Sequence, residues 1–322
     1  MKQPHPTWSA GIVNHGSYAD LEACLASIAL QTWPPERVVV WDTGVDAAAF
    51  LEIASKHPAV ECLPGTNVGY AGGANRVVAE LRGHADFVLV LNPDVFLDTT
   101  FSENLLGAAS AESNVAIATG KLLRPGRDLI DSAGIVFPRH RRPRDRGSEE
   151  RDEGQFNAQE RVEGASGAAM LIRETAIDEL TIEGELFDET FFAYHEDTDL
   201  CWRARRLRFE ILYVPTAVAV HKRGWRKDRR RSVPVMIRRH SFKNHYLQVM
   251  KNETLSQFVR NLPWLAGWEV LRLGHVVLRE RDLLPAYADA WRERSAAIRR
   301  RKIIRQRASA SELGVVSSRP LH

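Results

Sequence analysis

The stretch DFVLVLNPD, from Asp86 to Asp94, decides the fold class of this chain. Its residues 87–91 are all apolar, with no alternation between polar and apolar positions. A strand that is apolar on both faces belongs in a sheet covered on both sides, as parallel sheets are in α/β proteins. Pro93 lacks a backbone N–H and ends the strand. We therefore expect a buried strand whose carboxyl end carries Asn92 and Asp94.

The segments before this strand alternate between strand and helix patterns. Strands are predicted at 9–13, 37–42 and 59–64, and helices at 20–31, 46–57 and 70–83. This order predicts a mostly parallel central sheet covered by helices on both faces. Ligands bind such sheets at the carboxyl ends of the strands, so polar side chains there should line one crevice. Those side chains are Asn14, Asp42, Asn67, Asn92 and Asp94.

The pattern weakens after residue 125. Residues 128–137 predict a strand or half of a hairpin, and the charged, proline-bearing segment 138–159 should be a loop. Strand patterns return at 162–173 and 209–221, on either side of an acidic segment. The second half of the chain therefore adds strands without the regular strand–helix alternation of the first half.

The composition is that of an ordinary globular protein. The chain has 322 residues, 44% hydrophobic and 26% charged, with a formal net charge of +3. Cys24, Cys62 and Cys201 are scattered without metal-type pairing, so we expect core thiols in a reducing compartment. The first residues lack the apolar core of a signal peptide, and no stretch of eighteen residues is free of charge. We therefore expect a cytoplasmic protein without a transmembrane helix.

The acidic stretch AYHEDTDLCWR, from Ala193 to Arg203, has two compatible interpretations. Carboxylates are stabilised in the first turn of a helix, and Asp199 and Arg203 have the spacing of an i,i+4 ion pair. Alternatively, Glu196 or Asp197 performs chemistry, because a carboxylate at a helix start that borders a cleft is well placed to act as a base.

Three further features have a functional and a structural interpretation. Asp94 follows a buried strand, where a carboxylate can hold a hard cation with phosphate oxygens or simply form an Asx turn. The glycine-rich segment NVGYAGGANR (67–76) opens a helix and would let backbone approach a phosphate or sugar. His221, between an apolar and a basic run, is a metal ligand or a structural histidine.

Together these features resemble the inverting nucleotide-sugar glycosyltransferases of family two, in the branch with the bacterial rhamnosyltransferases. The resemblance covers Ala10 to about Lys251, and six segments follow the family's order. They are IVNHGSYADLEACLASIALQT, VVVWDTGVD, NVGYAGGAN, LNPDV, FDETFFAYHEDTDLCWRAR and VPTAVAVH. The chain departs from the family's pattern where WDTGVD lacks an asparagine, where Arg76 follows Asn75, and where Asn-Pro-Asp replaces two aspartates.

The resemblance implies a GT-A fold and a metal-dependent inverting sugar transfer. It makes Asp197 the catalytic base and Asp94 with His221 the ligands of Mg²⁺ or Mn²⁺. Glu196 would orient the acceptor, and Asp199 would pair with Arg203 or another basic neighbour. The donor-binding residues would be Asn14, Asp42, Asn67, Gly69, Gly72, Asn75 and Asn92.

The same resemblance implies a substrate pair. The donor is expected to be a nucleotide sugar, with dTDP-rhamnose as the preferred choice. The acceptor is expected to be a hydroxyl group of a glycan or of a lipid-linked sugar in cell-surface polysaccharide synthesis.

Beyond Lys222 the pattern changes to arginine-rich helices, which predicts a boundary between an α/β domain at 1–222 and a basic helical region at 223–322. Within that region, NLPWLAGWEVLRLGHVVL (261–278) looks like an amphipathic helix. It would lie on an anionic membrane surface, at the inner face of the cell membrane, or pack on its own domain or in a homodimer.

Two other function classes compete with sugar transfer. A nucleotidyltransferase would need a basic glycine-rich loop near the N-terminus, but GIVNHGSYAD (11–20) has no lysine or arginine. A nucleic-acid-binding protein would use the basic runs 221–231 and 299–307, which carry little aromatic interleaving beyond Trp225. Neither alternative accounts for the six segments, so we expect no nucleic-acid partner.

Overall fold

The computed structural model describes residues 5–223 and 233–312, so most of the basic run 221–231 lies outside the described residues. The strands are β1 (Trp8–Asn14), β2 (Val38–Asp42), β3 (Glu61–Pro64), β4 (Phe87–Leu91), β5 (Val95–Leu97), β6 (Val115–Leu123), β7 (Ile130–Ser132), β8 (Ile135–Val136), β9 (Arg144–Asp145), β10 (Glu160–Arg161), β11 (Ala169–Arg173) and β12 (Glu210–His221). The α-helices are α1 (Tyr18–Ala29), α2 (Ala47–Lys56), α3 (Gly69–Leu81), α4 (Phe101–Ser110), α5 (Glu174–Leu180), α6 (Glu196–Arg206), α7 (Val235–Asn252), α8 (Leu255–Arg279) and α9 (Pro285–Glu312). Two short 3₁₀ helices are η1 (Glu189–Phe191) and η3 (Arg281–Leu283).

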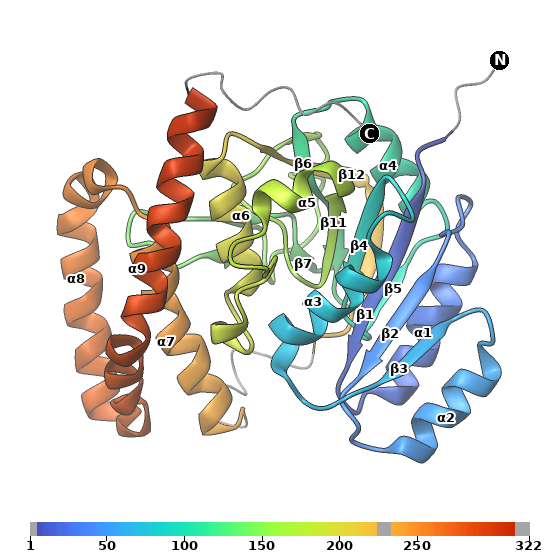
Figure 1. Cartoon of the computed structure of the whole chain (residues 1–322), viewed down its shortest axis with the longest axis horizontal. Helices are drawn as coiled ribbons and strands as arrows, with labels where there is room; N and C mark the ends of the chain where they lie inside the picture. The colour runs from blue at the N-terminus through green and yellow to red at the C-terminus, as the bar shows by residue number, and fades with distance from the viewer. Residues whose placement is uncertain (1–4, 224–232, 313–322) are drawn as a thin grey trace.

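One mixed sheet in the order β10-β12-β6-β11-β4-β1-β2-β3 forms the centre of the molecule (Figure 1). The predicted strands of the first half are all present, and β4, β1, β2 and β3 are mutually parallel. The second half adds β11, which runs antiparallel between β4 and β6, while β12 and β6 are parallel. The predicted α/β fold is therefore confirmed, with an antiparallel strand inserted in its middle.

Helices cover both faces of this sheet, as the apolar strands require. On one face, α1, α2 and α4 bury side chains such as Leu21 and Phe101 against β1 and β4. On the other face, α3, α5 and α6 bury a second set that includes Val77 and Leu200. All three cysteines are free: Cys24 and Cys201 are buried in these cores, and Cys62 is half-buried.

The long strand β12 is bent by a register shift between Val214 and Val218. This bulge lies beside Gly120 of β6, where an added Cβ would be 2.1 Å from the carbonyl oxygen of Ala217. Only a glycine allows the two backbones to approach so closely. The bend directs the end of β12 along β5, so that His221 lies opposite Val95.

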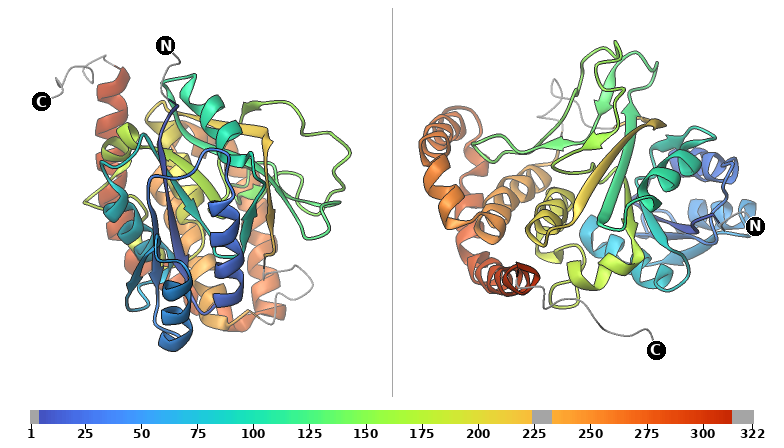
Figure 2. Two further views of the ribbon diagram at one scale, coloured as in Figure 1. Left: turned by 90° about the vertical axis from the view of Figure 1, so that its right-hand side faces the viewer. Right: turned by 90° about the horizontal axis from the view of Figure 1, so that it is seen from above.

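The C-terminal helices α7, α8 and α9 form a layer next to α6, at the left of Figure 1 and beyond α6 in the view from above in Figure 2. The predicted loop 138–159 is mostly irregular apart from β9, and its Arg141 forms a salt bridge with Glu253 at the end of α7. Among the described residues, no helix is both long and apolar enough to cross a membrane.

Candidate active site

The carboxyl ends of β1 and β2 hold the first two predicted site residues side by side. Asn14 and Asp42 are register partners, and the Asn14 side-chain amide donates to Asp42 Oδ1 at 2.6 Å. The other oxygen, Asp42 Oδ2, accepts from the Gly44 N–H at 2.9 Å and from the Tyr18 hydroxyl at 3.3 Å. Because both carboxylate oxygens have donors, Asp42 is held in one orientation at the strand end.

The glycine-rich start of α3 packs against the segment that leads to the acidic motif. Asn67 Oδ1 accepts from the N–H of Gly69, whose φ is +77°, a left-handed value that favours glycine. A Cβ on Gly69 would be 2.4 Å from the carbonyl oxygen of Phe192, which accepts from the Ala71 N–H at 3.1 Å. The glycine at position 69 is therefore required for the contact between the start of α3 and Phe192, whether or not a ligand also binds there.

Two other residues predicted to bind the donor have their main contacts within the protein. Both side-chain polar atoms of Asn75 bind the backbone of Phe187, at 2.8 Å each. The Cβ that Gly72 lacks would be 2.8 Å from Val68. Their direct contact with a donor stays a prediction.

Asp94 and His221 meet because β5 pairs with β12. Asp94 Oδ1 lies 3.4 Å from His221 Nε2, although the two residues are far apart in the sequence. The other ring nitrogen, His221 Nδ1, lies 2.7 Å from Oδ2 of Asp131, a fully buried residue of β7. Burial lowers the pKa of His221, but the hydrogen bonds to the two aspartates outweigh this and raise it to about 9.

Sequence reasoning did not identify Asp131. Its only signal is that it is the second of two aspartates in the largely apolar segment DLIDSAGIVF (128–137). Its neighbours compensate for its burial, because Arg124 Nε and Arg223 Nε lie 2.8 and 3.2 Å from Asp131 Oδ1. Burial raises the pKa of Asp131, but the hydrogen bond with His221 and the two arginines lower it overall.

Asp94 and His221 could together hold a divalent cation, which would displace the proton that the raised pKa of His221 favours. A carboxylate oxygen and an imidazole nitrogen face each other, and the second ring nitrogen is bound to a carboxylate, as in most metal-binding histidines. The described residues contain no cluster of three or more histidine, cysteine, aspartate or glutamate side chains suited to a metal. The remaining ligands would be phosphate oxygens and water, as is common for Mg²⁺.

A left-handed turn places the acidic motif at the start of α6. Phe192, Tyr194 and His195 have φ values of 62°, 69° and 72°, which cost energy in residues other than glycine. The side-chain amide of Asn244 on α7 lies within 2.9 Å of the carbonyl oxygens of Phe191, Ala193 and Tyr194. Helix α7 thus holds the turn that sets the direction of α6.

Asp197 has both carboxylate oxygens bound to backbone donors. Oδ2 accepts from the Gly167 N–H at 2.9 Å, and Oδ1 accepts from the Thr198 N–H at 2.6 Å. Burial raises the pKa of Asp197 despite these two hydrogen bonds. Gly167 lies just before β11, where Asn92 at the end of β4 donates its N–H to the carbonyl oxygen of Ala168. This strand therefore places the acidic motif next to the Asn92–Asp94 turn.

The pKa values of Glu196 and His195 are shifted in opposite directions. Glu196 is buried, its Oε2 has no hydrogen-bond partner among the described residues, and burial together with the charge of Asp197 raises its pKa well above the ordinary value. Burial lowers the pKa of His195 to about 3, so its imidazole is neutral and accepts from the Gln248 amide at 3.1 Å. Burial therefore favours the neutral form of both side chains.

Asp199 has a structural role that differs from the i,i+4 ion pair considered above. Its carboxylate lies 2.6 Å from Nζ of Lys251 and accepts from the Asn252 amide at 2.7 Å. Lys251 also pairs with Asp188 at 2.5 Å, and its side chain is fully buried. Arg203 instead donates to the carbonyl oxygen of Leu186. The partner of Asp199 is thus another basic neighbour, supplied by α7.

Comparison with known proteins gives the family. Residues 9–181, more than half of the chain, match the family described as Glycosyl transferase family 2. The chain belongs to glycosyl transferase family 2. It is 32% identical over 232 residues to an N-acetylglucosaminyl-diphospho-decaprenol L-rhamnosyltransferase of Mycobacterium tuberculosis, covering 63% of this chain and 72% of that protein. The predicted family and its rhamnosyltransferase-like branch are confirmed.

Solved structures support the fold. A mannosyltransferase from Pyrobaculum calidifontis, in complex with GDP-Man and Mn²⁺, superposes with a TM-score of 0.55 at 14% identity, covering 98% of this chain and 89% of its own. GalNAc-T7 with UDP, GalNAc and Mn²⁺ gives a TM-score of 0.58 at 13% identity, covering 78% of this chain and 48% of that one. The predicted GT-A fold with a helical C-terminal extension is therefore confirmed.

The buried Lys251 makes a prediction about stability. Lys251→Met keeps an unbranched side chain of similar shape but leaves Asp188 and Asp199 without their shared cation, so the free energy of unfolding should fall by about 3–5 kcal/mol. The exposed Lys56, which pairs with Glu52, is the matched control, and Lys56→Met should leave the unfolding midpoint nearly unchanged. Urea unfolding of the three proteins measures the difference, and equal midpoints for both variants would contradict a stabilising role for the cluster.

The pH dependence of this cluster has a definite sign. Burial raises the pKa of Asp188, but Lys251 and Arg300 outweigh it and hold the pKa below its ordinary value. The stabilisation is therefore present at neutral pH and is lost as the pH falls below about 4, the pKa of an unfolded aspartate. The stability difference between wild type and Lys251→Met should shrink over that range.

Proposed function

We propose that this family 2 enzyme transfers L-rhamnose from dTDP-rhamnose, with inversion, to a hydroxyl group of a glycan or lipid-linked acceptor in cell-surface polysaccharide synthesis. The observation that carries the reaction type is Asp197, a buried carboxylate held by two backbone donors beside the strand end that carries Asp94. The choice of sugar rests on the identity to the mycobacterial rhamnosyltransferase. The proposed site of action is the cytoplasmic side of the cell membrane.

In the proposed reaction, Asp197 is the catalytic base. The acceptor oxygen attacks the anomeric carbon of the donor, the bond from that carbon to the diphosphate oxygen breaks, and the hydroxyl proton passes to Asp197. A single displacement inverts the anomeric centre because no enzyme nucleophile takes part. The N–H groups of Gly167 and Thr198 keep the carboxylate in place. The raised pKa of Glu196 favours its protonated form, which would donate a hydrogen bond that orients the acceptor.

We further propose that Asp94 and His221 would hold Mg²⁺ or Mn²⁺. Such a cation supplies positive charge that stabilises the diphosphate leaving group. Asp131 holds the His221 ring so that Nε2 faces Asp94. The structural neighbours that contain Mn²⁺ with a nucleotide or nucleotide sugar support this assignment.

Helix α8 is the proposed membrane-binding element of a C-terminal region over residues 223–322, which follows a catalytic domain over 1–222. Its outer surface exposes ten large apolar side chains: Leu255, Phe258, Val259, Leu262, Trp264, Val270, Leu271, Leu273, Val277 and Leu278. Exposed Arg260 and Arg279 lie toward its two ends. Its only acidic residue, Glu269, is directed to the interior, where it accepts from the hydroxyls of Tyr246 and Tyr287.

This distribution of residues favours a membrane surface over water. Monomeric soluble proteins rarely expose so continuous an apolar face. An apolar helix face with arginines and no exposed acid is suited to lie in an anionic lipid interface. A second copy of the chain would cover the same face in a homodimer, so the oligomeric state must be measured with lipid binding.

The base makes a prediction about turnover. Asp197→Asn should keep donor binding but lower the rate of rhamnosyl transfer by about two to four orders of magnitude, because the amide cannot accept the proton. Transfer from dTDP-rhamnose to a short-chain N-acetylglucosaminyl-diphospho-lipid analogue measures this. Burial raises the pKa of Asp197. The wild-type rate should therefore rise with pH, and this rise should occur at a higher pH than the pKa of an ordinary aspartate. Asp199→Asn is the control, expected to reduce stability more than turnover, and a near wild-type rate for Asp197→Asn would refute the assignment.

The proposed metal site makes a separate prediction about binding. Asp94→Ala and His221→Ala should weaken Mn²⁺-dependent binding of dTDP, and Asp131→Asn should weaken it by about 10–100-fold through loss of the histidine's support. Calorimetric titration of dTDP with and without Mn²⁺ measures these effects. The control is Asp98→Asn, which changes an exposed carboxylate paired with Arg127. Full activity in the presence of chelator would show that basic side chains, rather than a cation, stabilise the leaving group.

The α8 surface makes a prediction about vesicles. The double variant Leu271→Glu/Leu278→Glu should abolish co-sedimentation with anionic vesicles at low salt, because it places charge on the apolar face. The pair Leu30→Glu/Leu51→Glu is the control, since these leucines, just after α1 and on α2, are 68% and 69% exposed, against 69% and 75% for the α8 pair. Failure of the wild type to sediment would exclude the membrane proposal, and a mass change of the α8 variant in light scattering would indicate a subunit interface instead.

A further inference from the structure

A two-part groove at the junction of α7, α8 and α9 lies outside the candidate active site. Its first part is a hollow of about 430 Å³ with an apolar lining of Val249, Met250, Leu255 and Phe258. Its second part is a hollow of about 410 Å³ lined by polar residues of α9. The two parts adjoin, because Ile298 and Arg301 line both of them.

The groove exists because the chain changes direction between α7 and α8. Helix α7 ends at Asn252 and α8 begins at Leu255, so the first turn of α8 leaves the α7–α9 pair and exposes its apolar residues. Arg301 of α9 holds this corner by donating to the carbonyl oxygen of Met250 at 2.8 Å. Leu255 and Phe258 are 73% and 42% exposed, and they continue directly into the outer face of α8.

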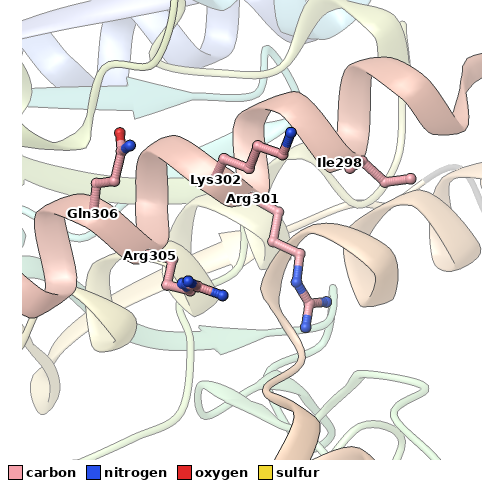
Figure 3. Close-up of a pocket in the computed structure, with 5 residues that line it drawn as sticks. All are labelled: Ile298, Arg301, Lys302, Arg305 and Gln306. Carbon is pink, nitrogen blue, oxygen red and sulfur yellow. The ribbon is translucent and has the colours of Figure 1, made fainter.

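The second part of the groove carries uncompensated positive charge. Figure 3 shows the side chains of Arg301, Lys302 and Arg305 extending from neighbouring positions of α9. Lys302 and Arg305 are exposed, and neither forms an ion pair within the part of the chain that the structure describes. Arg301 and Arg305 are one helical turn apart, where like charges repel.

The acidic residue nearest to the groove does not neutralise this charge. Glu253 lines the apolar part, but it is buried and its carboxylate forms a two-bond salt bridge with Arg141. The groove therefore offers an apolar wall at one end and three cations at the other. A free anion would use only the basic end, and an apolar peptide would use only the other.

We propose that this groove binds one anionic phospholipid of the membrane. Its phosphate would contact Arg301, Lys302 and Arg305, and an acyl chain would lie along Val249, Met250, Phe258 and Ile298. In the cell, the protein would meet this lipid through the proposed membrane attachment of α8. Binding of a lipid molecule from solution does not depend on that attachment. Such a site would fix how the enzyme sits on the bilayer, since it lies at the N-terminal end of the apolar face of α8.

The test uses the full chain and a lipid that is monomeric in solution. Dihexanoyl-phosphatidylglycerol, kept below its critical micelle concentration, is titrated into the protein by calorimetry. Dihexanoyl-phosphatidylcholine and inorganic phosphate are titrated in parallel. We expect the phosphatidylglycerol to bind clearly more tightly than either of the others, with an affinity that falls as salt is added.

A charge-reversal pair tests the basic end. Lys302→Glu/Arg305→Glu should weaken phosphatidylglycerol binding by roughly 30-fold, a factor of about five for each basic residue lost. Lys56→Glu/Arg151→Glu changes the net charge equally, away from the groove, and should leave the affinity unchanged. Arg301 is kept in both proteins because it supports the backbone at Met250.

Any one of four other outcomes would contradict the proposal. Equal binding of phosphatidylcholine would mean that only the apolar wall binds, and equal binding of inorganic phosphate would mean an anion site that does not recognise lipid. Unchanged affinity in Lys302→Glu/Arg305→Glu would place the lipid elsewhere, and a change of mass in light scattering would assign the groove to a second copy of the chain. Because the assay contains neither vesicles nor sugar donor, failure of α8 to bind membranes or of the enzyme to transfer rhamnose would be seen separately.

Discussion

The buried ammonium group of Lys251 is the interaction on which the arrangement of the active site depends. It lies between the carboxylates of Asp188 and Asp199, and all three side chains are at most 3% exposed. A charge removed from water is tolerated only with a partner, so these groups must be buried together. Helix α7 is thereby fixed against η1 and α6. The C-terminal region of a family 2 glycosyltransferase is, in this chain, part of the framework of its acidic motif.

That framework explains how a strained turn is maintained. Phe192, Tyr194 and His195 have left-handed backbones that would not persist in isolation. Asn244 and Gln248, on the same face of α7 as Lys251, bind this turn and His195. Strain is thus balanced by hydrogen bonds from a neighbouring helix, and the carboxylate of Asp197 is presented beside β11.

The outer surface of the same helical layer has the opposite distribution of polar and apolar residues. Helix α7 buries polar and charged residues, whereas α8 exposes most of its large apolar ones. Apolar area exposed to water is unfavourable, and buried charge is costly. Each side of the layer therefore needs a partner that compensates for its residues. The inner side of this layer holds the acidic motif, and the proposed lipid contact of its outer side would account for the exposed apolar residues.

The sequence by itself determined the local elements and the family. Period-two and period-3.6 patterns predicted the first strands and helices, and DFVLVLNPD predicted a sheet covered on both faces, because these signals are short-range. The order of six segments indicated family two. Only the tertiary structure decided which distant groups meet. Asp131 contacts His221 because β7 and β12 both pair with β6, and Asp199 pairs with Lys251 rather than with Arg203, four residues along its own helix. Spacing within one helix makes a pair available, but burial decides which cation a carboxylate receives, and burial depends on how the whole chain packs.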